Sequence, residues 1–377
     1  MYLLAKPKTI KEQDGQMLLC HSTHIVMTKE VAETEMHAAK RLQEAIRQET
    51  GLILPFSVGE VREGDLSLGI AKTLPEQTYE ITIDEKGGQI SGGDGAGVLY
   101  GVETFCQIVQ QCGGILPCVQ IQDAPDMPNR GYYFDQTRGR VLKLEELKKI
   151  ADRMCRYKLN QLQLYVEHTY LFRDFSEMWR DQTPLTAEEI LELDSYCRER
   201  HIELVPSLAS FGHLCTLLST KTYGDLCEME DSWKEPFSFW NRMRYHTINV
   251  SDERSLPLIK KMIAEYMQLF SSNKFNICAD ETFCLGKYKS KKLAEERGVH
   301  RLYIDYVKEL AQFLVENGKI PMFWGDIIWN SPELMKELPE SMICLNWGYA
   351  PEQREDETRA IAQTGAVQYL CPGVCGW

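Results

Sequence analysis

The 377-residue sequence lacks any run of apolar residues long enough to span a bilayer. Residues 1–7 also lack the basic start and long apolar segment that mark a secretory signal peptide. A net charge of −13 argues against the basic surface that nucleic acids or anionic membranes require. We therefore expect a cytoplasmic protein that binds neither nucleic acid nor a membrane.

Cysteine is not scarce, but a disulfide framework is missing. The 13 Cys residues are odd in number and have no regular spacing, which suits a reducing compartment. The close pair Cys371 and Cys375 has no His or second Cys pair beside it, and the sequence has no His-x-x-x-His motif. We therefore expect neither a metal site nor a cofactor.

Residues 1–125 predict a small α+β domain. Val31–Thr50 has helical periodicity and is followed by Gly51, a suitable residue for a helix end. A second amphipathic helix is expected at Gly97–Gln111. Between the helices, alternating segments predict strands at Leu66–Ile70, Tyr79–Ile83 and Gln89–Ser91. The proline-bearing stretch 123–128 predicts a stiff connector, with a second domain at 126–377.

From Arg130 onward, predicted strands alternate with predicted helices. The strands are Gly131–Phe134, Gln161–Val166, Glu203–Ser207, Phe275–Ala279, Met322–Trp324, Ile343–Trp347 and Val367–Leu370. The helices between them are Leu144–Tyr157, Ala187–Arg200, Leu256–Phe270, Tyr303–Asn317 and Asp356–Thr364. This alternation implies parallel strands with right-handed crossovers, as in a TIM-type (β/α)8 barrel. Only seven strands are found, and the open edges of the first and seventh favour association, which leaves a homo-oligomer open.

Polar and aromatic residues follow nearly every predicted strand. They are Asp135-Gln-Thr-Arg138, Glu167-His168, Phe211-Gly-His213, Asp280-Glu281, Trp324-Gly-Asp326, Trp347-Gly-Tyr349 and Tyr369, with Trp377 beyond. The carboxyl ends of barrel strands meet on one face, so these residues are expected to line one pocket.

The adjacent acids Asp280 and Glu281 are the most informative of these residues. They follow an apolar run, and charges at the mouth of a buried strand are costly unless they are compensated or used. Burial and a neighbouring charge can hold one carboxyl in its neutral, proton-donating form. A proton donor beside a fixed negative charge is what the cleavage of an acetal bond requires.

Over nearly all its length the chain resembles glycoside hydrolase family 20, the β-N-acetylhexosaminidases. The resemblance lies in Arg130-Gly followed by Asp135-Gln-Thr-Arg138, in the Gly-His pair ending at His213, and in Ala279-Asp-Glu281 followed by Leu285-Gly286. It implies a small amino-terminal α+β domain and a (β/α)8 barrel.

The resemblance also implies roles for individual residues. Glu281 would be the general acid, and Asp280 would orient and stabilise the substrate's own 2-acetamido group as it attacks the anomeric carbon. Arg138 would bind the hydroxyls of the terminal sugar. Further substrate-binding candidates are Glu167, His168, His213 and Asp326. Trp324, Trp347 and Trp377 would surround the acetamide methyl group with aromatic faces, and Tyr369 would donate a hydrogen bond to the acetamide oxygen. The sequence departs from the family at Cys371, where an acidic residue is usual.

Each of these residues also has a simpler interpretation. Asp-Glu pairs are common in a chain with 55 acidic residues, Arg138 could be an ordinary ion pair, and the tryptophans could be packing. The predicted function is a retaining exo-β-N-acetylhexosaminidase that removes terminal β-linked GlcNAc or GalNAc from a carbohydrate. Two alternatives stay open. One is another acetamido-assisted glycosidase, such as an O-GlcNAc hydrolase or a β-N-acetylgalactosaminidase, and the other is a catalytically silent carbohydrate-binding protein.

Overall fold

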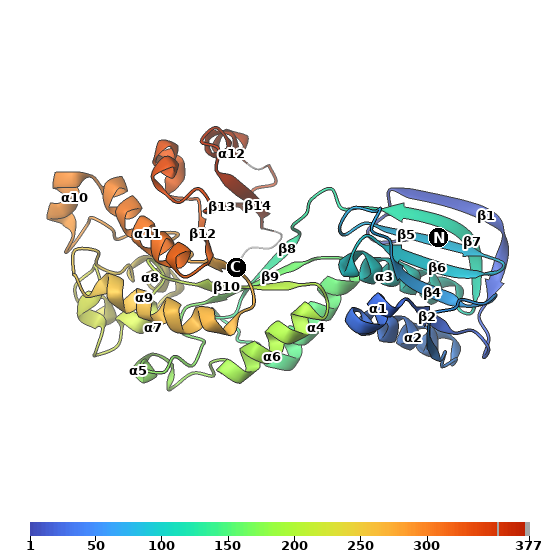
Figure 1. Cartoon of the computed structure of the whole chain (residues 1–377). Helices are drawn as coiled ribbons and strands as arrows, with labels where there is room; N and C mark the ends of the chain where they lie inside the picture. Colours follow the sequence, from blue (N-terminus) through green and yellow to red (C-terminus); the bar gives the residue numbers. More distant parts are fainter. Residues whose placement is uncertain (353, 374–377) are drawn as a thin grey trace. The chain divides into compact units, whose positions relative to one another are not determined.

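The computed structural model describes residues 1–352 and 354–373, which form two compact units (Figure 1). The first unit contains residues 1–132, 145–162 and 195–203, and the second contains the other described residues. The first unit therefore includes most of helix α4 (Leu144–Arg156) and the end of α6 (Ala187–Arg198). Along the described chain, no helix is both long and apolar enough to cross a membrane.

The first unit contains a seven-stranded mixed sheet with the strand order β1-β7-β5-β6-β4-β2-β3. Its elements are β1 (Thr9–Leu18), β2 (Ile25–Met27), α1 (Lys29–Thr34), α2 (Met36–Thr50), β3 (Phe56–Val58), β4 (Leu66–Ile70), β5 (Tyr79–Asp84), β6 (Gly87–Gly92), α3 (Gly95–Cys112) and β7 (Ile115–Asp123). Helix α3 packs on β5 and β6, and α2 packs on α3. Strand β5 buries alternate residues, which is the pattern of a sheet covered on one face. The expected small α+β arrangement is therefore confirmed.

The structure divides one predicted helix of this unit into two helices. The periodic segment Val31–Thr50 is divided between α1 and α2 at Glu35, whose φ is −119°. The Glu35 amide still donates to the Val31 carbonyl, but its carboxylate is buried and lies 2.8 Å from Nε2 of His201. The helical periodicity of the sequence continues through the break, so the sequence alone did not indicate it.

The second unit contains a seven-stranded sheet with the order β14-β13-β12-β11-β10-β9-β8. The strands are β8 (Gly131–Asp135), β9 (Gln161–Val166), β10 (Glu203–Leu208), β11 (Lys274–Asn276), β12 (Ile320–Trp324), β13 (Ile343–Gly348) and β14 (Val367–Pro372). The pairings from β10 through β14 are all parallel. Each of the six residues of β9 is buried, as expected for a parallel strand covered on both faces.

The connections of this unit contain the remaining helices, α5 (Ser176–Trp179), α7 (Cys215–Leu218), η1 (Gly224–Leu226), η2 (Ser232–Lys234), α8 (Phe239–Arg244), α9 (Ser255–Tyr266), η3 (Met267–Leu269), α10 (Lys291–Arg297), α11 (Val299–Glu316), η4 (Ile328–Asn330), η5 (Pro332–Glu337) and α12 (Glu355–Ala362). Helix α11 packs on β12 and α9, and α12 packs on β14 (Figure 1). The alternation of strand and helix predicted from the sequence is confirmed, with β8 and β14 at the two ends of the strand order.

The predicted strand Phe275–Ala279 is wrong at its carboxyl end. Strand β11 stops at Asn276, because Cys278 and Ala279 have φ angles of 57° and 63°, which no strand residue adopts. The buried Asn276 side chain stabilises this turn, since its Oδ1 accepts from the Cys278 amide at 2.8 Å. The chain thus leaves the sheet just before the two acids.

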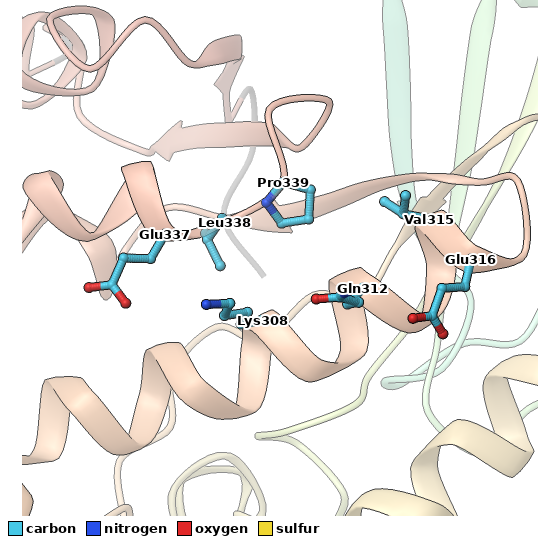
Figure 2. A pocket seen from close by; sticks show the side chains of 7 residues that line it. All are labelled: Lys308, Gln312, Val315, Glu316, Glu337, Leu338 and Pro339. Atoms are coloured by element: carbon cyan, nitrogen blue, oxygen red, sulfur yellow. The ribbon is translucent and has the colours of Figure 1, made fainter.

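A cavity of about 300 Å³ lies between α11 and the end of η5 (Figure 2). Its lining residues are Lys308, Gln312, Val315, Glu316, Glu337, Leu338 and Pro339. None of the predicted site residues that the structure describes lines it, and we assign it no function.

Candidate active site

The two acids lie on a turn held in an uncommon backbone conformation. Cys278, Ala279 and Glu281 all have left-handed φ angles, with Glu281 at 47°. Each such residue costs on the order of 1–3 kcal/mol and persists only where its surroundings enforce it. Here the Tyr303 hydroxyl donates to the Ala279 carbonyl at 3.0 Å, from a fully buried position. Such enforced strain is typical of functional sites.

The segment after β10 packs directly against this turn at Gly212. A Cβ atom on Gly212 would lie 2.6 Å from the Asp280 carbonyl oxygen and 3.3 Å from that of Glu281. Only glycine allows the two backbones to approach so closely. The next residue, His213, also has a left-handed φ, of 60°. This close contact between the two backbones places the predicted Gly-His pair next to the acids.

The imidazole of His213 lies between the two carboxylates. Its Nε2 is 3.4 Å from Oδ2 of Asp280 and 3.3 Å from Oε2 of Glu281, and the ring is buried. Burial disfavours a charged ring, but the negative charge of Asp280 and the contacts with both acids outweigh it and raise the pKa of His213 to about 10. Burial likewise opposes ionisation of Asp280, yet the His213 charge holds the pKa of Asp280 below its usual value. Asp280 is therefore a fixed negative charge at neutral pH.

A third acid, Asp326, supports the turn from the end of β12. Its Oδ2 accepts a hydrogen bond from the Glu281 amide at 2.9 Å, and its Oδ1 is buried without a partner. Burial, followed by the charge of Asp280, raises the pKa of Asp326 to about 8. Asp326 is therefore largely a neutral carboxylic acid at pH 7, beside an ionised Asp280.

An Asp326→Asn variant is expected to melt at least about 3 °C higher than the wild type at pH 8. The folded-state pKa of Asp326 is raised, so the unfolded chain loses this proton near pH 4 and the folded chain only near pH 8. Wild-type stability therefore falls as the pH rises through that window, whereas Asn keeps the acceptor for the Glu281 amide without titrating. Thermal melting from pH 4 to 8 should show the difference growing with pH. The exposed Asp181→Asn change serves as the control, and a constant or shrinking difference would contradict the account.

Arg138 is fixed by the turn that follows β8. Its Nε donates to Oδ2 of Asp135 at 2.7 Å, and its backbone amide donates to Oδ1 of the same residue at 2.8 Å. The guanidinium carbon lies 4.6 Å from the centre of the Tyr165 ring, and the side chain is almost fully buried. A buried guanidinium held in one orientation is well suited to bind hydroxyl groups of a ligand.

Glu167 connects Arg138 to a second arginine, which the sequence analysis missed. The Glu167 carboxylate is 2.9 Å from Nη2 of Arg242, accepts from the Tyr165 hydroxyl at 2.9 Å and is 4.0 Å from Nε of Arg138. Burial would raise the pKa of Glu167, but the charges of Arg242 and Arg138 outweigh it and lower that pKa. Nδ1 of His168 lies 3.9 Å from the same carboxylate, and burial lowers the pKa of His168.

Two groups of aromatic side chains accompany the charged residues. Trp324 packs edge-on against Tyr133, with ring centres 4.9 Å apart. Trp347 belongs to a second group, with its ring centre 6.4 Å from that of Trp329 and 5.2 Å from that of Tyr349. The indole nitrogen of Trp329 is buried without a hydrogen-bond partner, which leaves it able to donate to a ligand.

Two predicted site residues are placed less directly. Tyr369 lies in β14, in register with Leu345 of β13. Trp377 lies outside the described residues. The substrate-binding roles of both residues stay predictions.

Within the described residues, His213, Asp280 and Glu281 could together surround a metal ion, since each has a ligand atom within 4.8 Å of the others. A metal ligand must be a neutral imidazole, however, and the raised pKa of His213 favours the protonated ring. We therefore interpret the three residues as an ion-pair cluster.

Arg242 could have been suspected from the length of its connection. Residues 209–254 separate β10 from α9, and long connections of this kind are often functional. Tyr133 and Trp329 gave no such signal. Tyr133 lies within a predicted strand, and Trp329 follows the Trp324-Gly-Asp326 motif, which already supplied a tryptophan.

Comparisons with known proteins match nearly all of the chain to models of one family. The model described as "Glycosyl hydrolase family 20, domain 2" matches residues 2–124, and the one described as "Glycosyl hydrolase family 20, catalytic domain" matches residues 128–373. A beta-hexosaminidase of Porphyromonas gingivalis is 24% identical over 99% of this chain and 50% of its own length. One of Akkermansia muciniphila is 30% identical over 37% of this chain and 33% of its own length. The chain thus spans half or less of these curated relatives.

Solved structures confirm the fold class. A beta-N-acetylhexosaminidase of Bacteroides fragilis matches with a TM-score of 0.78 and 18% identity, over 97% of this chain and 74% of that one. A chitobiase of Flavobacterium johnsoniae matches with a TM-score of 0.85 and 19% identity, over 98% of this chain and 59% of that one. At these identities the structural similarity supports the fold alone, which is a TIM-type barrel with a preceding α+β domain. The match of the catalytic-domain model to most of the sequence shows that this chain belongs to glycosyl hydrolase family 20.

Proposed function

We propose that this chain is a retaining exo-β-N-acetylhexosaminidase in which the substrate's 2-acetamido group is the nucleophile. The family supports the reaction class, and the named relatives are hexosaminidases. The observation that carries the proposal is the turn on which two adjacent acids lie in different surroundings. Asp280 is held ionised by His213, whereas the side chain of Glu281 is the more exposed of the two.

The first step breaks the glycosidic bond. The acetamide oxygen attacks the anomeric carbon, the bond from that carbon to the leaving oxygen breaks, and Glu281 gives its proton to the leaving oxygen. The acetamide becomes a positively charged oxazolinium ring. Asp280, a preformed negative charge, stabilises this ring as its charge develops.

The second step releases the sugar. Glu281, now a carboxylate, takes a proton from water, and the water oxygen bonds to the anomeric carbon as the bond to the acetamide oxygen breaks. Two displacements at one carbon restore its original configuration. No protein side chain forms a covalent bond to the sugar in either step.

The other site residues would hold the sugar in place. Arg138, oriented by Asp135 and backed by Glu167, supplies hydrogen-bond donors for the ring hydroxyls. Trp324 and Trp347 supply apolar faces for the acetamide methyl group. Asp326 supports the turn through the Glu281 amide.

The wild-type protein is expected to hydrolyse 4-nitrophenyl N-acetyl-β-D-glucosaminide at least about 10³-fold faster than the corresponding β-glucoside. Both substrates have the same leaving group, but only the first carries the intramolecular nucleophile. Initial rates measured by nitrophenolate release test this. Comparable rates on the two glycosides would contradict acetamide participation. Parallel rates on the N-acetyl-β-D-galactosaminide would separate a preference for GlcNAc from one for GalNAc.

A further inference from the structure

A buried acid outside the catalytic cluster, Glu228, lies just after η1 in the long connection between β10 and α9. Its side chain is fully buried, and its backbone amide donates to the Thr247 carbonyl at 2.9 Å. A carboxylate in such a position is costly unless hydrogen bonds compensate its charge. The groups that compensate it therefore show which part of the chain Glu228 holds.

The carboxylate of Glu228 accepts hydrogen bonds from the segment that leads from the proposed acid to α10. Ser290 donates to Oε1 through its hydroxyl at 2.7 Å and through its amide at 3.0 Å. The Tyr288 amide donates to the same oxygen at 3.2 Å, and the Lys289 amide donates to the Glu228 carbonyl at 3.3 Å. Hydrogen bonds to a carboxylate are stronger than those between neutral groups. Glu228 is thus an anchor for residues 288–290.

Further contacts continue from this anchor back to Glu281. The Gly286 amide donates to Oγ of Ser290 at 3.0 Å, and the Phe283 amide donates to the Glu281 carbonyl at 2.7 Å. A Cβ atom on Gly286 would lie 2.8 Å from Cβ of Ala294, so the segment also packs tightly on α10. The chain after the proposed acid is therefore held by hydrogen bonds and packing as far as Glu228.

The position of Glu281 matters because a general acid must lie within hydrogen-bond reach of the glycosidic oxygen. A displacement of about 1 Å can lower the rate about 10²-fold. We propose that Glu228 is a positioning residue, which acts through Ser290 and the 282–290 segment to hold the carboxyl of Glu281 at the leaving oxygen. This inference rests on the proposed function and adds a residue that no contact with substrate would reveal. Its effect should depend on the leaving group, because only an oxygen that needs a proton depends on where the acid lies.

The test compares a leaving group that needs a proton with one that does not. N,N′-diacetylchitobiose has a sugar leaving group, whereas 2,4-dinitrophenyl N-acetyl-β-D-glucosaminide releases a phenolate that leaves unprotonated. In Glu228→Met, which keeps the size but removes the acceptors, the ratio of kcat/KM for the disaccharide to that for the dinitrophenyl glycoside should fall about tenfold. Ser290→Ala, which removes the hydroxyl between Glu228 and Gly286, should lower this ratio at least about threefold. Glu228→Gln keeps Oε1 as an acceptor and should hold the ratio within about twofold of wild type.

A matched control separates positioning from a general loss of stability. Glu103→Met removes another buried carboxylate, which pairs with Arg41 in the first unit. It should lower the melting temperature, because it leaves a charged partner unpaired, but it should keep the ratio at its wild-type value. A fall of the ratio in Glu103→Met as large as that in Glu228→Met would overturn the proposal.

A ratio within twofold of wild type in both Glu228→Met and Ser290→Ala would also overturn it, as would equal losses on the two substrates. If Glu228→Met does not fold, Ser290→Ala decides alone. Failure of the proposed function looks different, because the wild type would then hydrolyse neither glycoside. In that event hydrogen–deuterium exchange tests the anchor: faster exchange in Ser290→Ala confined to residues 281–290 supports it, and unchanged exchange there overturns it.

Discussion

Glu281→Gln is expected to lower kcat/KM for N,N′-diacetylchitobiose by about 10²–10⁴-fold. The sugar leaving group is a poor one and needs the proton that Gln cannot give. On the 2,4-dinitrophenyl glycoside the loss should be less than about tenfold, because that phenolate leaves without protonation. The ratio kcat/KM is the appropriate measure, since it reports the steps up to cleavage of the glycosidic bond.

A matched surface change separates this effect from a general loss of charge. Glu296→Gln alters an exposed residue of α10 and should leave both rates at wild-type values. If Glu281→Gln lowered kcat/KM by the same factor for the disaccharide and for the dinitrophenyl glycoside, Glu281 would not be the proton donor.

Asp280→Asn is expected to lower kcat/KM by about 10²–10³-fold, and by the same factor on both of those substrates. The oxazolinium charge develops whatever the leaving group is, so the loss should not depend on it. Asn keeps the size and a hydrogen-bonding group but removes the fixed negative charge that His213 stabilises. The two acids thus have distinct signatures, one dependent on the leaving group and one independent of it.

The control for Asp280→Asn is Asp174→Asn, which removes an exposed ion pair with Lys261. It should leave the rates unchanged. A loss in Asp280→Asn that was confined to the disaccharide would reverse the roles assigned to the two acids.

Much of the fold could be predicted because local patterns and burial agree. Strands β4 and β9 have the predicted bounds, and both carry apolar residues at alternate positions, the pattern of a strand. Strand β1 was missed because its sequence is mostly polar, and its residues are largely exposed at the edge of the sheet, where it pairs with β7. The break between α1 and α2 could not be predicted, because the helical periodicity continues through Glu35, and the contact of Glu35 with His201 joins residues distant in sequence.

The site was predictable where residues follow strand ends, and less so elsewhere. Asp280, Glu281 and His213 were expected to meet, and the structure brings them together. Their backbone conformation was not predicted. The apolar run before the acids was predicted as a strand, but it ends in a strained turn, and left-handed φ angles have no signature in the amino-acid composition. Arg242 comes from α8, which no strand-end rule covers, and only the fold brings it to Glu167.

The most direct test of the central claim is calorimetric titration with a thiazoline analogue of the oxazolinium intermediate. Asp280 is proposed to stabilise the bicyclic, positively charged form of the substrate more than its ground state. The wild type should therefore bind the thiazoline at least about 10²-fold more tightly than GlcNAc, and Asp280→Asn should lose most of that advantage. Equal affinities of the wild type for thiazoline and GlcNAc would contradict the account.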